Sequence, residues 1–129
     1  MYGLIPGTVV SVAVGPITHF GIVSDRQSNG LPHIISCSRR TGQVAEESAA
    51  AFANGGKIKV HGYPGERQPL HVMQKARSAL GTKYDLFKWN CEHFVRWAHE
   101  LKPESPQLLA AMIIGLIGLG LILRKSKLA

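Results

Sequence analysis

Hydrophobic and polar positions over the first sixty residues form short runs that are typical of β-strands. These runs lie at residues 8–14, 17–23, 33–38 and 57–60. Turn-forming residues separate them, most clearly Ser28-Asn29-Gly30 and Asn54-Gly55-Gly56. The pattern therefore predicts a sheet built largely from the first half of the chain.

The later part of the chain contains segments with helical spacing. Residues 46–54 predict a short helix whose first turn carries acidic side chains, and residues 70–80 predict a second helix that stops at Gly81. Residues 91–101 predict a third helix with Asn90 as its N-cap. One face of this helix is apolar and carries Cys91, Phe94, Val95, Ala98 and Leu101. The expected fold class is α+β, with an antiparallel sheet packed against the helix that bears the cysteine.

A continuous apolar run, LLAAMIIGLIGLGLIL, occupies residues 108–123 and is followed by Arg124, Lys125 and Lys127. As a helix it would measure roughly 24 Å, less than the ~30 Å hydrocarbon core of a bilayer. We expect a single, marginal C-terminal membrane anchor, or a helix that embeds without crossing; a buried core helix is the alternative. The predicted organisation is a folded domain over 1–107, a hydrophobic helix over 108–123 and a basic tail over 124–129.

Composition narrows the functional classes. The chain has 129 residues, a formal net charge of +7 and only two cysteines, which excludes a secreted disulfide scaffold. Its basic residues are dispersed outside the tail, so we expect a membrane surface and no nucleic acid as partner. The N-terminal residues lack a basic segment typical of a signal peptide, which favours a cytosolic position for the folded domain.

Cys91 is the strongest candidate for chemistry. Backbone N–H groups and the dipole at a helix N-terminus stabilise a thiolate, although an inert buried cysteine is the alternative interpretation. A nucleophilic thiol needs a base. His19 lies in a predicted strand with Gly21 on the same face, which would leave space beside the imidazole for a thiol. His33 begins the next predicted strand, and antiparallel pairing would bring it beside His19.

The segment Asn90-Cys91-Glu92-His93-Phe94-Val95 resembles the NCEHF signature of the lecithin retinol acyltransferase (LRAT) family. This family includes small phospholipase/acyltransferases related to H-Ras-like suppressors. Further segments resemble the family in their order along the chain: Gly7-Thr8-Val9, His19-Phe20-Gly21-Ile22-Val23, His33-Ile34-Ile35, Glu46-Glu47-Ser48 and Gly81 to Leu86. The likeness covers most of residues 1–107.

The resemblance implies a circularly permuted form of the papain-like, NlpC-type fold. It also implies that Cys91 is the nucleophile, His19 its base and His33 the residue that orients His19. Residues 24–32 form a longer connection than the tight hairpin usual in the family. His93 matches the motif but is expected to support structure. The implied reaction passes the acyl group of a phospholipid through a thioester to water, an amine or a hydroxyl acceptor, without cofactor or metal.

Two other functions remain open from the sequence. A peptidase or isopeptidase of deubiquitinase-like type could use the same scaffold, because related proteins carry a similar Asn-Cys-x-His-Phe segment. A non-catalytic module anchored by its tail is the other. Outside the proposed site, Cys37 is expected to be a small buried hydrophobic residue, and His61 and His71 are expected to lie at the surface.

Overall fold

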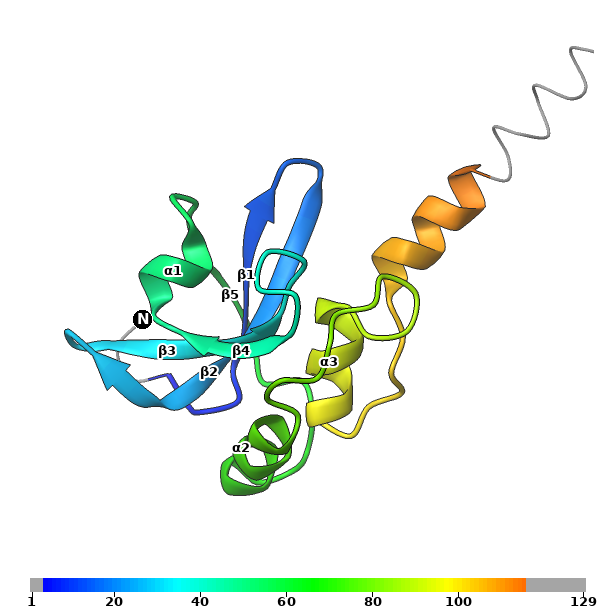
Figure 1. Cartoon of the computed structure of the whole chain (residues 1–129). Coiled ribbons are helices and arrows are strands. Elements are labelled where there is room, and N and C mark those ends of the chain that lie inside the picture. Colours follow the sequence, from blue (N-terminus) through cyan, green and yellow to red (C-terminus); the bar gives the residue numbers. More distant parts are fainter. Residues whose placement is uncertain (1–3, 116–129) are drawn as a thin grey trace, which may run out of the picture.

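The computed structural model describes residues 4–115, in which strands fill most of the first half and helices most of the second (Figure 1). The elements in chain order are β1 (Val9–Val14), β2 (Ile17–Ser28), β3 (Leu31–Cys37), β4 (Val44–Glu47), α1 (Ala49–Ala53), β5 (Lys59–Gly62), α2 (Pro69–Ser78) and α3 (Cys91–Ala98). The α+β class predicted from the sequence is confirmed.

The strands form one antiparallel sheet in the order β4-β3-β2-β1-β5. Because side chains alternate along a strand, the sheet has two apolar faces. Val9, Ile22 and Ile35 belong to a core that includes residues of α2 and α3. Val10, Val23 and Ile34 belong to a smaller core with Phe52 of α1. In Figure 1, α1 accordingly lies on one side of the sheet, and α2 and α3 lie on the other.

The connection between β2 and β3 is much shorter than the sequence predicted. Strand β2 continues to Ser28 and β3 begins at Leu31, so the turn consists of two residues. Asn29 and Gly30 have φ angles of 52° and 77°, the left-handed conformation that two-residue hairpins favour. A shift of register between Val23 and Gln27 accommodates the extra length within the hairpin.

The helix predicted over residues 46–54 is wrong in its first part. Glu46 and Glu47 belong to β4, which pairs with β3, and the helix starts only at Ala49. Ser48 is its N-cap, with a side-chain oxygen that accepts from the N–H of Ala51 at 3.1 Å. A pairing partner in β3 therefore outweighs the preference of acidic residues for a helix N-terminus.

The chain is also helical over 106–115, and this segment extends away from the sheet (orange in Figure 1). Leu109, Met112, Ile113 and Ile114 on it are exposed, Ile114 to 70%. Among residues 4–115, no helix combines the length and the apolar character needed to cross a membrane. The rest of the predicted anchor, 116–123, and the basic tail lie outside the described residues.

Candidate functional site

The first turn of α3 is organised by the motif that contains Cys91. The side-chain oxygen of Asn90 accepts from the N–H groups of Glu92 at 2.9 Å and His93 at 3.2 Å. In return, Nδ1 of His93 accepts from the N–H of Asn90 at 3.0 Å, which completes a capping box. Phe94 is fully buried in the core below. The structural role expected for His93 is therefore confirmed.

Cys91 is the first residue of α3 and is 8% exposed. Burial raises the pKa of its thiol above the usual range. Backbone N–H groups of Phe20, Glu92 and Cys91 itself act in the opposite direction, because they can donate to the thiolate. The thiol is thus neutral at neutral pH in the resting protein, with N–H groups already placed for the charged form.

The Cys91 thiol can approach the backbone N–H of Phe20 because β3 does not pair with β2 at this position. The N–H and C=O of Val23 bond to Thr8 and Gly7, on the β1 side. By the alternation of an antiparallel ladder, the N–H of Phe20 points to the β3 side. The pairing of β2 with β3 begins only at Ile22, so this N–H is left for the thiol. Cys91 therefore lies at the edge of β2, beside the residue that follows His19.

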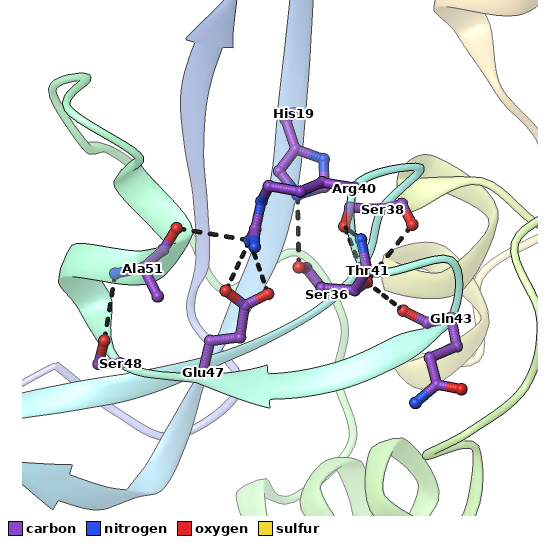
Figure 2. A network of polar contacts seen from close by, with 9 residues as sticks. All are labelled: His19, Ser36, Ser38, Arg40, Thr41, Gln43, Glu47, Ser48 and Ala51. Atoms are coloured by element: carbon purple, nitrogen blue, oxygen red, sulfur yellow. Dashed lines mark hydrogen bonds and ion pairs between the residues drawn. The ribbon is translucent and has the colours of Figure 1, made fainter.

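His19 lies on β2 opposite Val12, and its ring is 5.2 Å from that of Phe52 between centroids. Its Nε2 is 3.3 Å from the hydroxyl oxygen of Ser36 on β3, a contact drawn in Figure 2. Ser36 is only 1% exposed. Burial lowers the pKa of His19 to about 4, Arg40 lowers it further, and Glu47 partly opposes the shift. His19 is therefore a neutral imidazole at neutral pH. Both His19 and Cys91 are among the described residues, and no hydrogen bond joins their side chains.

The sequence predicted that the space beside Gly21 would hold a thiol, but Ile34 and Phe52 lie there instead. A Cβ placed on Gly21 would lie 2.6 Å from a methyl group of Ile34 and 2.9 Å from the ring of Phe52. Glycine at this position therefore lets Phe52 pack beside His19. It makes room for the small core on the α1 face rather than for the thiol.

His33 is not brought beside His19. It faces the irregular part of the hairpin, where its Nε2 is 2.6 Å from the hydroxyl of Ser28 and its Nδ1 is 3.4 Å from a carboxylate oxygen of Glu46. The pairing of Ile22 with Ile35 places Ser36 and Cys37 of β3, and not His33, toward the His19 end of β2. The expected antiparallel neighbour of His19 was wrong because the hairpin turn lies at Asn29 and Gly30.

A loop after β3 adds a basic group to the site. Nη2 of Arg40 donates to both carboxylate oxygens of Glu47, at 2.7 and 2.6 Å. Figure 2 shows this ion pair between the loop and β4, next to α1. The loop itself is held by Ser38, whose hydroxyl accepts from the N–H of Thr41 at 3.0 Å. Arg40 is thereby fixed where its charge disfavours protonation of His19.

Glu92 connects the first turn of α3 to the segment that follows the helix. One of its carboxylate oxygens accepts from the hydroxyl of Ser105 at 2.7 Å and from the N–H of Gln107 at 3.1 Å. The amide of Gln107 then makes two bonds to the backbone of Thr18, accepting from its N–H at 2.8 Å and donating to its C=O at 2.7 Å. We call Glu92, Ser105, Gln107 and Thr18 the linker clasp. It joins the residue after Cys91 to the residue before His19.

Sequence reasoning missed Ser36, Arg40 and Gln107, because each acquires its partner from a distant segment. Its expectations for Cys37, His61 and His71 are confirmed. Cys37 is fully buried, and burial raises the pKa of its thiol to about 12. Its Sγ donates to the carbonyl of Trp89 at 3.3 Å. His61 and His71 are exposed, as expected.

The family model for lecithin retinol acyltransferase matches residues 4–102, about three quarters of the chain. The chain belongs to the lecithin retinol acyltransferase family. Membership indicates an enzyme of the acyltransferase type and agrees with a capped helix that presents a cysteine. A comparison with curated proteins gives no match.

Proposed function

We propose that this family member is a thiol-dependent phospholipid acyl hydrolase or acyltransferase that works through an acyl-thioester on Cys91. The observation that carries the proposal is the position of Cys91 at the capped N-terminus of α3, where its thiol meets the backbone N–H of Phe20, the residue after His19 on β2. A histidine strand that precedes the cysteine helix also supports a circularly permuted papain-like domain, close to the small phospholipase/acyltransferases.

The first half-reaction transfers one proton and forms one bond. Nε2 of His19 faces Ser36, so Nδ1 is the atom left to take the proton from the Cys91 thiol. The sulfur attacks the ester carbonyl carbon, and the lysophospholipid leaves as an alcohol after receiving that proton from His19. Because both groups start neutral, proton transfer accompanies the attack rather than preceding it.

Backbone N–H groups at the start of α3 support the negative charge that develops during the attack. The N–H of Cys91 points to the thiol region, and the N–H of Phe20 approaches from β2. Such donors stabilise the oxyanion of a tetrahedral intermediate. In the second half-reaction, water, an amine or a hydroxyl acceptor attacks the thioester carbonyl, and His19 takes its proton. The acyl group is released and the thiol is restored.

In this proposal, Ser36 rather than His33 holds the His19 ring in its orientation. The 3.3 Å contact between Ser36 Oγ and His19 Nε2 supports this assignment. The hydroxyl can accept from Nε2–H, which favours the tautomer with a free lone pair on Nδ1. His33 then belongs to a separate contact with Ser28 and Glu46.

A lipid surface is the proposed partner. Exposed apolar side chains on the 106–115 helix support this, since they begin directly after the linker clasp. A membrane-associated protein with its folded domain in the cytosol would thereby hold its site close to lipid ester bonds. The net charge of +7 favours an anionic head-group layer.

The test is intact-mass spectrometry of the full chain after incubation with phosphatidylcholine vesicles. We expect an acyl adduct on Cys91, release of lysophospholipid, and loss of both in Cys91→Ser. The Cys37→Ser variant is the matched control and should keep the adduct. Cleavage of a ubiquitin-fluorophore amide without any lipid product would instead establish the peptidase alternative. If neither product forms, the protein is a non-catalytic module.

A further inference from the structure

The loop that follows β3 covers residues 38–42, here called the arginine loop, and it carries Arg39 and Arg40 next to each other. Both side chains belong to exposed residues. The N–H of Gly42 donates to the carbonyl of Ser38 at 2.9 Å, which closes the loop into a tight turn. The two guanidinium groups therefore extend from a backbone that hydrogen bonds hold in place.

The arginine loop starts beside both proposed catalytic residues. Ser36 lies two positions before the loop and contacts the His19 ring. Cys37 comes next, and its Sγ donates to the carbonyl of Trp89, which lies two residues before Cys91. The loop is therefore anchored between the strand that carries His19 and the segment that leads to Cys91.

Arg40 lies on the His19 side of the arginine loop, and its charge is already paired. Its Nη2 donates to both carboxylate oxygens of Glu47, and Figure 2 shows this ion pair beside His19. The same guanidinium lowers the pKa of His19, after the larger effect of burial. Arg40 therefore acts on the proposed base, and the second arginine of the loop is the one left for a substrate.

Arg39 lies on the Cys91 side of the arginine loop. Its guanidinium carbon is 6.0 Å from the centre of the Tyr84 ring. The N–H of Tyr84 donates to the carbonyl of Gly42 at 2.9 Å, so the backbone next to this ring is bonded to the loop. Burial raises the pKa of the Tyr84 hydroxyl, the charge of Arg39 lowers it, and a charge on Cys91 raises it. The hydroxyl is thus close enough to feel both the guanidinium and the thiol.

The positive charge of Arg39 is not neutralised by a neighbouring carboxylate. Within residues 4–115, the ion pairs of arginine involve other members of the chain and not Arg39. Asp85 follows the Tyr84 segment, and its Oδ1 accepts from two backbone N–H groups of its own loop at 2.9 and 3.0 Å. Lys83 pairs through its backbone with Gln43, directly after the arginine loop, and adds a second exposed cation. This part of the surface is therefore suited to an anion.

We propose that Arg39 binds the phosphate group of the phospholipid substrate while the ester carbonyl lies at Cys91. The inference rests on the proposed function and names the part of the substrate that determines specificity. Only a few bonds separate the ester carbonyl of a glycerophospholipid from its phosphate, so a phosphate-binding group must lie near the nucleophile. Arg39 meets this requirement, because its loop is held against the segment that leads to Cys91. A guanidinium also offers paired N–H donors that match two phosphate oxygens.

The kinetic experiment gives the full chain phosphatidylcholine or diacylglycerol with the same acyl chains, in micelles of a non-ionic detergent. Neither lipid has a net charge, so long-range attraction does not distinguish them. Arg39→Gln should lower kcat/KM about tenfold for phosphatidylcholine, and less than about twofold for diacylglycerol, because a charge-assisted hydrogen bond to phosphate is lost. Arg39→Lys keeps the charge without the paired donors and should lose about threefold. Arg26→Gln is the matched control, because it removes the same charge from an exposed position toward the other end of β2.

A binding measurement separates phosphate recognition from catalysis. In full-length Cys91→Ala in the same micelles, dihexanoyl phosphatidylcholine should shift the Nε–Hε NMR signal of Arg39, and inorganic phosphate at equal concentration should not. An unshifted signal, together with the same preference between the two lipids in wild type and Arg39→Gln, would overturn the phosphate site while turnover upholds the proposed function. A shifted signal without turnover or adduct in the wild type would overturn the proposed function instead. A larger shift with inorganic phosphate than with the lipid would identify a free anion as the ligand, and the proposal would fail.

Discussion

Ser36 and His33 illustrate how a single residue acquires its role from its neighbour across the sheet. Both lie on β3, three positions apart, yet only Ser36 contacts the His19 ring. His33 contacts Ser28 and Glu46 near the hairpin turn. Strand register, rather than residue type, therefore decides which residue of β3 contacts His19.

These contacts predict different effects on kcat for two alanine variants. Ser36→Ala should lower kcat about tenfold, because it removes one hydrogen bond that holds the imidazole. His33→Ala should change kcat less than twofold. Steady-state ester hydrolysis measures both. A larger loss in His33→Ala than in Ser36→Ala would restore His33 as the orienting residue.

The charge of Arg40 helps to set the pH at which kcat/KM falls on the acid side, because it lowers the pKa of His19. With the His19 pKa at about 4, the base is neutral above that pH, so kcat/KM should fall only as the pH drops through about 4. Arg40→Gln removes a positive charge near the ring and should move this limb to higher pH. Burial, the largest cause of the lowered pKa, should keep it below the ordinary value of 6.5. An unchanged limb in Arg40→Gln would exclude the charge effect.

The start of α3 is the element on which the proposed chemistry depends. Its capping box is local, with every partner within three residues. Asn90→Ala should reduce the free energy of unfolding by ~1–2 kcal/mol, because two N–H groups lose their acceptor. Asn90→Asp, which keeps an acceptor, should lose less. Urea denaturation of both variants measures the difference, and equal losses would contradict the capping role.

The linker clasp is a second feature that holds whole elements together, because it joins α3 and the segment after it to β2. Gln107 bonds to the N–H and the C=O of Thr18, one residue before His19. Gln107→Ala should make the Thr18 amide proton exchange about tenfold faster, because its acceptor is lost. Gln107→Glu can still accept from that N–H and should give an intermediate rate. Unaltered exchange in Gln107→Ala would show that the clasp is not formed in solution.

At the scale of the whole molecule, burial keeps three histidines in their neutral forms, and one of them joins distant parts of the fold. His99 is 2% exposed, and its Nε2 donates to the carbonyl of Gly7 at 2.7 Å, which joins the end of α3 to the start of β1. Its Nδ1 is buried without a partner. Burial lowers the pKa of His19, His93 and His99 in the folded protein.

This predicts a loss of stability in mild acid. In the unfolded chain a histidine binds its proton near pH 6.5, whereas the folded protein resists protonation until lower pH. The free energy of unfolding should therefore decline as the pH falls from 7.5 through 6.5 and below. Each fully buried histidine contributes up to ~1.4 kcal/mol per pH unit until its folded pKa is reached. Urea titrations at pH 7.5 and 5.5 measure this decline.

His99→Gln should make the decline between these two pH values smaller. A decline of equal size in wild type and His99→Gln would mean that His99 does not contribute to the acid response.

The sequence by itself determined the local features of this protein. Alternating apolar positions identified the β1–β3 region, and Asn90, His93 and Phe94 specified the start of α3, because caps and strand faces depend on residues a few positions apart. The same local motif identified the family. Only the tertiary structure decided that Ser36 faces His19, that Glu92 binds the linker, and that a cavity lies between the sheet and α3. These contacts depend on strand register and on how the chain returns to the sheet, which are set by the packing of segments far apart in the sequence.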